Sequence, residues 1–154
     1  MTIQLDRILD LSLYYYVKGL MPSFVTIVDG FPGSETSADP NLVLPTVSVD
    51  ALDLSPVPFE LGSLDKTKRF WAIDVFAKNK SQRDDFAYLI FNQLKDSVIP
   101  VYNYDVGFPP TVVPQIGYLV SENINAKPIY VFRDLVQDLY WRSRITFFTK
   151  YTEV

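Results

Sequence analysis

The chain has 154 residues, the length of one typical domain, and 48% of them are hydrophobic, enough to bury a sizeable core. It contains no cysteine and no histidine. This composition excludes disulfides, thiolate nucleophiles, cysteine-ligated zinc, and every triad or metal site that needs an imidazole. The formal net charge of −4 argues against tight binding to phosphate backbones, because that affinity comes from clustered lysines and arginines.

The N-terminal segment does not resemble a targeting sequence. It lacks a basic start, and Asp6, Arg7 and Asp10 interrupt its apolar positions. No uncharged run reaches the ~18 residues that a bilayer-crossing helix needs. We therefore expect a soluble protein of one domain over residues 1–154, and the lack of cysteine is compatible with a reducing cytoplasm.

Aromatic residues make up 15% of the chain, with 10 Tyr, 11 Phe and 2 Trp. Such rings bury large areas in cores and are enriched at the centres of interfaces. Two interpretations stay open: a well-packed β core, or rings that lie against neighbouring subunits.

A helix is predicted over residues 2–18, with Thr2 as its N-cap and with stop signals at Gly19 and Pro22. The tyrosines at 14–16 cover more than one face, so one or two of these rings must lie outside the apolar stripe. At helical spacing, that stripe consists of Leu5, Ile8, Leu9, Tyr16 and Leu20.

Short strands are predicted over residues 24–28 and 45–49, separated by a turn-rich segment through residue 41. Residues 50–68 mix extended pieces with turns, because prolines and a glycine interrupt them. The basic cluster at the end of this segment is expected to be a solvated strand entrance; it consists of Lys66, Lys68 and Arg69.

A strand is predicted over residues 70–77 with large apolar groups on both sides, so neither side is expected to be fully solvated. One side carries Trp71, Ile73 and Val75, and the other carries Phe70, Ala72, Asp74 and Phe76.

The strongest helical pattern covers residues 81–97, where Ser81 and Asp84 match a capping-box start. Its predicted core stripe consists of Phe86, Leu89, Ile90 and Leu94, widened by Ala87 and Phe91.

Strands are then predicted over residues 98–102, 116–120 and 128–132, with a Gly/Pro loop over 103–114. A short helix over residues 134–139 is an alternative for the end of this region.

The last predicted strand, residues 140–151, would span about 40 Å at ~3.3 Å per residue. One of its faces carries Trp141, Ile145, Phe147 and Tyr151, and the other carries Arg142, Arg144, Phe148 and Lys150. The order of elements predicts an α+β domain: a mainly antiparallel β-sheet packed by one or two α-helices, with long Pro/Gly-rich loops.

Acidic residues offer two weak candidates for cation chemistry. Asp84 and Asp85 are adjacent, but both are expected in the first turn of a helix, where the macrodipole favours negative charge. Asp50, Asp53 and Glu60 lack the spacing of a calcium loop, so a solvated loop is favoured. Phosphate-binding glycine motifs and nucleophile-elbow motifs are also missing, and we expect no enzyme activity, catalytic residue, metal or cofactor.

Asp74 lies in the middle of its predicted strand. If that strand pairs with the last one, Arg142 or Arg144 would be its partner across the sheet. An ordinary cross-strand ion pair is the favoured interpretation; contact of these residues with a neighbouring subunit is the alternative.

The basic stripe of Arg142, Arg144 and Lys150 alternates with aromatic residues, which permits weak, non-specific contact with DNA. Tight binding is not expected, because the rest of the chain is acidic and no nucleic-acid motif accompanies the stripe.

Four segments after the N-terminal helix carry a resemblance to a known family. They are an L-P-x-V-x-V strand at 44–49, the aromatic strand RFWAIDVFAKN at 69–79, the helix at 81–97, and the closing strand LYWRSRITFFTKYTE at 139–153. In this order they resemble the tail-terminator and neck proteins of tailed bacteriophages, also called tail-completion or head–tail joining proteins. The proline-rich segments 31–58 and 105–114 depart from the compact family pattern and are expected to be insertions that contact neighbouring rings.

The resemblance implies a structural virion protein that forms a ring, a homo-hexamer, at the head-proximal end of the tail. Such a ring ends tube polymerisation and joins the tail to the head connector, with DNA passing through its channel. The implied partners are the tail tube protein and the head–tail connector, the implied location is the virion tail or neck after assembly in the host cytoplasm, and no membrane is involved. Expected subunit-interface positions are Phe70, Asp74, Phe76, Arg142, Arg144 and Phe148.

Two alternatives remain from the sequence. The chain could be another tail component, such as a tube or baseplate subunit. It could also be a non-enzymatic cellular binding module that holds a partner on an aromatic sheet face.

Overall fold

The computed structural model describes residues 5–29, 43–57, 66–95, 97–103, 115–129 and 141–153. Over these ranges the chain forms two helices and six strands. The helices are α1 (Leu5–Leu20) and α2 (Lys80–Leu94), and the strands are β1 (Thr26–Asp29), β2 (Thr46–Val57), β3 (Lys66–Ala77), β4 (Val98–Tyr102), β5 (Gln115–Ile129) and β6 (Trp141–Glu153).

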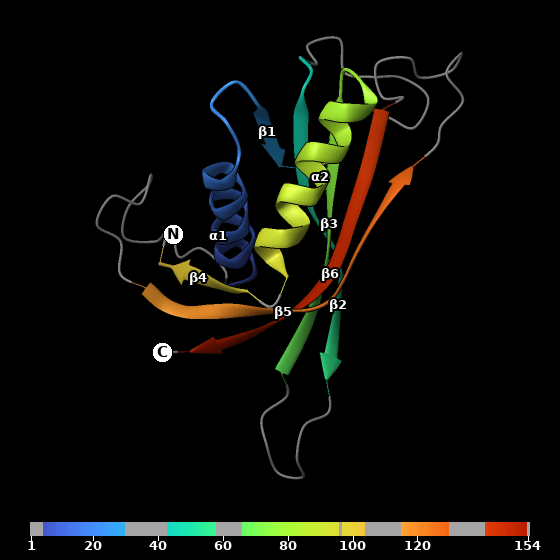
Figure 1. Cartoon of the computed structure of the whole chain (residues 1–154). Coiled ribbons are helices and arrows are strands. Elements are labelled where there is room, and N and C mark those ends of the chain that lie inside the picture. Colours follow the sequence, from blue (N-terminus) through green and yellow to red (C-terminus); the bar gives the residue numbers. More distant parts are fainter. Residues whose placement is uncertain are drawn as a thin grey trace.

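All six strands belong to one sheet with the order β1-β2-β3-β6-β5-β4. Only the short β1 is parallel to its neighbour; the other four pairings are antiparallel. Both helices lie on the same side of this strongly twisted sheet, and β4 with the start of β5 curls beneath α1 (Figure 1). The predicted α+β fold with a mainly antiparallel sheet is therefore confirmed.

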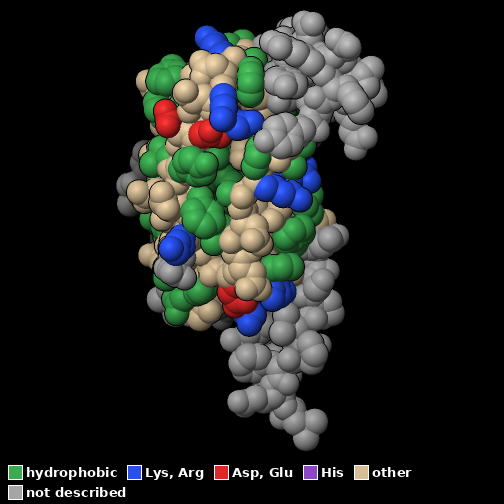
Figure 2. Space-filling model, turned by 45° about the vertical axis from the view of Figure 1, so that its right-hand side comes forward, with side chains coloured by type: hydrophobic (Ala, Val, Ile, Leu, Met, Phe, Trp, Pro, Cys, Tyr) green, Lys and Arg blue, Asp and Glu red, His purple; other side chains and the backbone are tan. Residues whose placement is uncertain are grey.

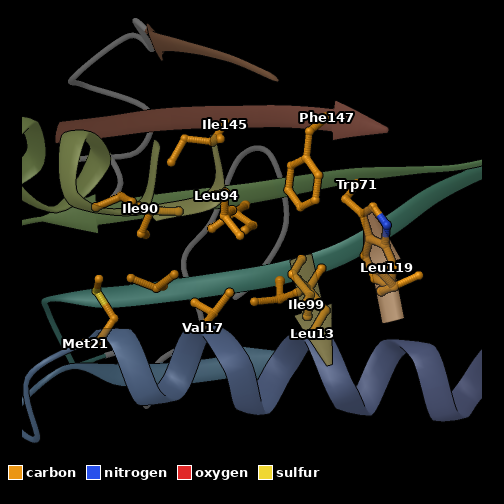
Figure 3. Close-up of a cluster of buried hydrophobic side chains, with 14 of the residues drawn as sticks. Leu13, Val17, Met21, Trp71, Ile90, Leu94, Ile99, Leu119, Ile145 and Phe147 are labelled. Atoms are coloured by element: carbon orange, nitrogen blue, oxygen red, sulfur yellow. The ribbon is translucent and has the colours of Figure 1, made fainter. Parts of the chain in front are cut away.

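The hydrophobic core fills the space between the helices and the sheet (Figure 3). Helix α1 packs against β4, β1 and β2, while α2 packs against β6, β3 and β5. Each fully buried large apolar side chain contributes about 1.5–3 kcal/mol relative to an exposed one. The largest of them are Leu13, Val17, Val47, Trp71, Ile73, Phe76, Ile90, Leu94, Ile99, Leu119, Ile145 and Phe147, of which Phe76 alone lies outside the core cluster between the helices and the sheet.

The buried face of α1 differs in part from the predicted stripe. Ile8 and Leu9 are buried as expected, but the stripe continues through Leu13 and Val17, and Leu5 is 44% exposed. Tyr16 and Leu20 are only half-buried, and the expected cap at residue 2 lies outside the described residues. Leu9, Leu13 and Val17 are four residues apart, about one helical turn each, so they lie on one side of α1, which is the side turned to the core.

The start of α2 corrects the predicted capping box. Asn79 is the N-cap, and its side-chain oxygen accepts a hydrogen bond from the Gln82 backbone N–H at 2.9 Å. Ser81 lies inside the helix. The helix begins two residues earlier than the predicted capping box places its start. Asp84 and Asp85 therefore lie beyond the first turn, so the macrodipole does not explain why acidic residues occur at these positions.

The end and the buried face of α2 also differ from prediction. The helix ends at Leu94, three residues early, where Ser97 Oγ donates a hydrogen bond to the Leu94 carbonyl. Phe86, Ala87, Ile90 and Leu94 are buried as predicted. Leu89 is exposed and Phe91 half-buried, because they lie to either side of the face that contacts the sheet.

Strand β2 replaces the predicted mixture of turns after residue 49. It continues to Val57 through a bulge between Ala51 and Asp53, so Asp50 and Asp53 belong to a strand and not to a solvated loop. The strand extends this far because β2 pairs with β3 along its whole length. The backbone hydrogen bonds between the two strands outweigh the weak strand propensity of Asp and Pro.

Strand β5 is longer than predicted, because a β-bulge connects two extended segments that the sequence does not predict as one strand. The register with β6 shifts by one residue between Glu122 and Asn125, and Asn123 has a φ of 52°, which asparagine tolerates. The extra residue changes which side chains face the helices, from Leu119 before the bulge to Ala126 after it. The strand bends there and follows the full length of β6 (Figure 1).

Strands β4 and β6 confirm the predictions at 98–102 and at the C-terminal strand, which runs from Trp141 to Glu153. The predicted strand at 128–132 is the end of β5 as far as Ile129. The alternative helix at 134–139 and most of the loop at 103–114 lie outside the described residues.

Candidate functional site

The predicted interface residues lie together on one face of the sheet. We call this the outer face: the even-numbered residues of β3 and β6, which point away from α1 and α2. In the part of the chain that the structure describes, no helix covers it. Three directly opposed pairs bring the six residues into contact distance: Phe70 with Phe148, Asp74 with Arg144, and Phe76 with Arg142.

Asp74 is the centre of the outer face. Its carboxylate accepts hydrogen bonds from Arg144 Nε at 3.0 Å and from Arg144 Nη2 at 3.2 Å, and a third from Arg142 Nε at 3.2 Å. The carboxylate is thus held by two guanidinium groups from β6, one of them bidentate. The predicted cross-strand ion pair is confirmed, and it uses both arginines.

Burial and neighbouring charge shift two groups beside Asp74. The hydrogen bond to Asp74 raises the pKa of Arg144. Burial raises the pKa of Asp50, and the nearby carboxylates of Asp29 and Asp74 raise it further, against the opposing effect of Arg144. The carboxyl group of Asp50 is therefore harder to ionise in the folded protein than in the unfolded chain.

Asp50→Asn is expected to stabilise the protein at pH 7 and to have no effect near pH 3. Since the folded-state pKa of Asp50 lies above the ordinary value of 3.8, ionising it costs stability, and this cost appears as the pH rises from 3.8 through the raised value. Urea unfolding at both pH values measures the difference. Asp85→Asn, on the exposed side of α2, is the control; a gain from Asp50→Asn at pH 3 equal to that at pH 7 would refute the electrostatic cause.

An aromatic pair occupies the other end of the outer face. The Phe70 and Phe148 ring centroids lie 4.7 Å apart, and Lys68 Nζ lies 4.4 Å from the centroid of Phe148. Glu122 of β5 bridges Lys68 at 3.6 Å and Lys150 at 3.2 Å. These half-buried ion pairs lie beside the two rings on the outer face.

The six residues differ in accessibility. Phe76 is completely buried and Asp74 is 2% exposed, with the Arg142 guanidinium 5.4 Å from the Phe76 ring centroid. The other four are half-buried. The surface that a partner could touch is therefore formed by Phe70, Phe148, Arg142 and Arg144.

The predicted basic stripe is neutralised by acidic partners within the chain. Arg142 and Arg144 contact Asp74, and Lys150 contacts Glu122. On the side seen in Figure 2, lysine and arginine side chains are scattered among apolar ones, and acidic groups lie near the upper and lower ends. This arrangement permits weak contact with a polyanion and does not form a dense cationic track.

A second ionic cluster, centred on Arg69, was not predicted from the sequence. This residue is buried and not a solvated strand entrance: its side chain points to the helix side of β3. Arg69 Nη1 donates to Asp6 at 2.9 Å, Nη2 donates to Asp10, and the guanidinium lies 4.9 Å from the ring centroid of Trp71. The available signal was the spacing of Asp6 and Asp10, which puts two carboxylates on one side of α1.

The described residues contain no group of three acidic side chains placed to hold a metal ion. Among the helices described, none is long and apolar enough to cross a membrane. No protein-family model matches this chain, and a comparison with curated proteins finds no match either.

Proposed function

We propose that this chain is a structural subunit of a bacteriophage tail or neck, which closes into a ring at the head-proximal end of the tail, stops tube growth and joins the tail to the head connector. The outer face carries the proposal. It presents two aromatic rings in contact and two half-buried arginines on a sheet surface that no described helix covers. Rings at the centre of a contact area with arginines beside them are typical of protein interfaces.

The order of elements is consistent with the proposal. The segments that carry the family resemblance form α1, β2, β3, α2 and β6, in that order, as the resemblance implies. The aromatic strand and the closing strand are neighbours in the sheet, so their outer-face residues form one surface.

A closed ring needs heterologous contacts, in which one surface of a subunit meets a different surface of the next. The outer face supplies one such surface. On the described part of the chain, β1 and β4 are the two ends of the sheet, and each has one side without a paired strand. A DNA channel also suits an acidic protein whose outer-face cations are already paired, because the cargo must pass without being held tightly.

The test is the mass of the native particle, with electron-microscope class averages of the purified chain alone and with tail tube subunits. We expect a single closed ring that caps tube growth. Stacked rings of the chain alone would instead indicate a tube subunit. A monomer at high concentration, even with tube and connector partners present, would refute ring assembly and favour a cellular binding module.

A matched pair of variants connects the ring to the outer face. Phe148→Ser is expected to prevent assembly, because it removes one ring of the aromatic pair. Phe24→Ser is the control, since Phe24 is more exposed and lies between α1 and β1, away from the outer face. Circular dichroism checks that both variants fold. If both variants assembled equally well, the outer face would not be part of the subunit interface.

A further inference from the structure

A polar hollow lies between the start of α2 and the second half of β5, separate from the outer face. Its volume is about 250 Å³. The side chains that matter for its chemistry are Lys80, Arg83, Asp84, Tyr88, Lys127 and Ser143. Three elements form it, since α2, β5 and β6 each contribute to the lining.

Arg83 is the unusual member of this group. It occupies a position on the buried stripe of α2, and its side chain is only 5% exposed. Its Nε donates to Asp84 at 2.9 Å, and the guanidinium carbon lies 5.7 Å from the centroid of the Trp141 ring. Within the part of the chain described by the structure, neither Nη atom donates a hydrogen bond, although a guanidinium carries five N–H donors.

An acceptor inside the hollow would give these Nη groups a charge-assisted hydrogen-bond partner. The planar fork of Arg83 suits a group with two oxygens, such as a carboxylate or a phosphate.

The charged side chains around Arg83 also favour the binding of an anion. Lys80 and Lys127 add two exposed ammonium groups, and Asp84 is the one acidic residue among the lining residues that the structure describes. The hollow is therefore cationic in a chain whose formal net charge is −4. Lys80 is also the first residue of α2, the end of a helix where anions are favoured.

We infer that this hollow binds the oxyanion group, carboxylate or phosphate, of a small organic anion. Arg83 would bind the oxygens from the buried side and the two lysines would close over them. The exposed ring of Tyr88 would cover an apolar part of the ligand. This site does not depend on the proposed ring assembly.

Isothermal titration of the full chain tests the inference with three probes: inorganic phosphate, phenyl phosphate and benzoate, each against a sodium chloride blank. We expect saturable binding of at least one probe and tighter binding of a probe with a ring. Preference between phenyl phosphate and benzoate identifies which oxyanion is the ligand. No saturation by any probe, or an equal response to chloride, would overturn the inference.

Variants locate the binding in the hollow. Arg83→Gln is expected to weaken it about tenfold and Lys127→Gln about threefold, the scale of one lost charge-assisted hydrogen bond. Lys95→Gln, just beyond the far end of α2, is the matched control and should bind like the unchanged protein. If Arg83→Gln does not fold, the double variant Lys80→Gln/Lys127→Gln is measured in its place. If this double variant bound the probe as tightly as Lys95→Gln does, the binding site would lie outside the hollow.

Discussion

Asp74→Ala is expected to lower the free energy of unfolding by about 4 kcal/mol, a large part of the stability of a domain this size. The cost arises because two guanidinium groups lose their common counter-charge. Arg142 and Arg144 would then face each other on β6 with no carboxylate between them. Asp74→Asn keeps the shape of the side chain and should cost nearly as much, which would assign the effect to charge and not to a cavity.

Urea unfolding at low protein concentration measures this effect without assembly. Glu122→Gln is the control, because its ion pairs with Lys68 and Lys150 are more exposed and should be worth less than about 1 kcal/mol. Sedimentation velocity of the same variants separates the structural role of Asp74 from a role in subunit contact. A loss from Asp74→Ala below 1 kcal/mol would contradict the central role assigned to its carboxylate.

The outer face could be predicted from the sequence because strand alternation is regular in its two strands. The alternation of residues 70–76 puts Phe70, Asp74 and Phe76 on one side of the strand, so one assumption, that this strand pairs with the last one, is enough to give Asp74 an arginine as its partner. The register comes from the distant pairing itself: the sequence leaves Arg142 and Arg144 both open, and the structure places Arg144 directly opposite Asp74.

The remaining differences have local causes that a single sequence does not reveal. The bulge at Asn123 breaks the period of two, so the halves of β5 look like unrelated segments. The cap of α2 could be assigned to Asn79 or Ser81 by residue type alone, and the backbone selects the first. Arg69 looks like part of a solvated cluster because its acidic partners lie 59 and 63 positions away. The buried Arg83 has the same origin: a charged residue takes a core position when the tertiary structure offers a partner.

Arg69→Met is expected to lower the free energy of unfolding at pH 7 by about 3 kcal/mol. Methionine fills much of the same volume beside Trp71, so the loss reports mainly the missing charge. Without the guanidinium, the partly buried carboxylate of Asp10 loses its main counter-charge. Burial already raises the pKa of Asp10, and Arg69 is the strongest influence that opposes this rise.

The pH dependence distinguishes this explanation from a packing defect. In Arg69→Met the folded-state pKa of Asp10 moves further above its ordinary value of 3.8, so the variant loses stability as the pH rises from 3.8 through that higher pKa. The difference from the unchanged protein should therefore be largest at pH 7 and shrink towards pH 4, where Asp10 takes up a proton. Lys68→Met, the preceding residue on the opposite side of β3, is the control with an expected loss below about 1 kcal/mol. A deficit for Arg69→Met that stays constant between pH 4 and pH 7 in urea titrations would attribute the loss to packing against Trp71 and not to the ionic cluster.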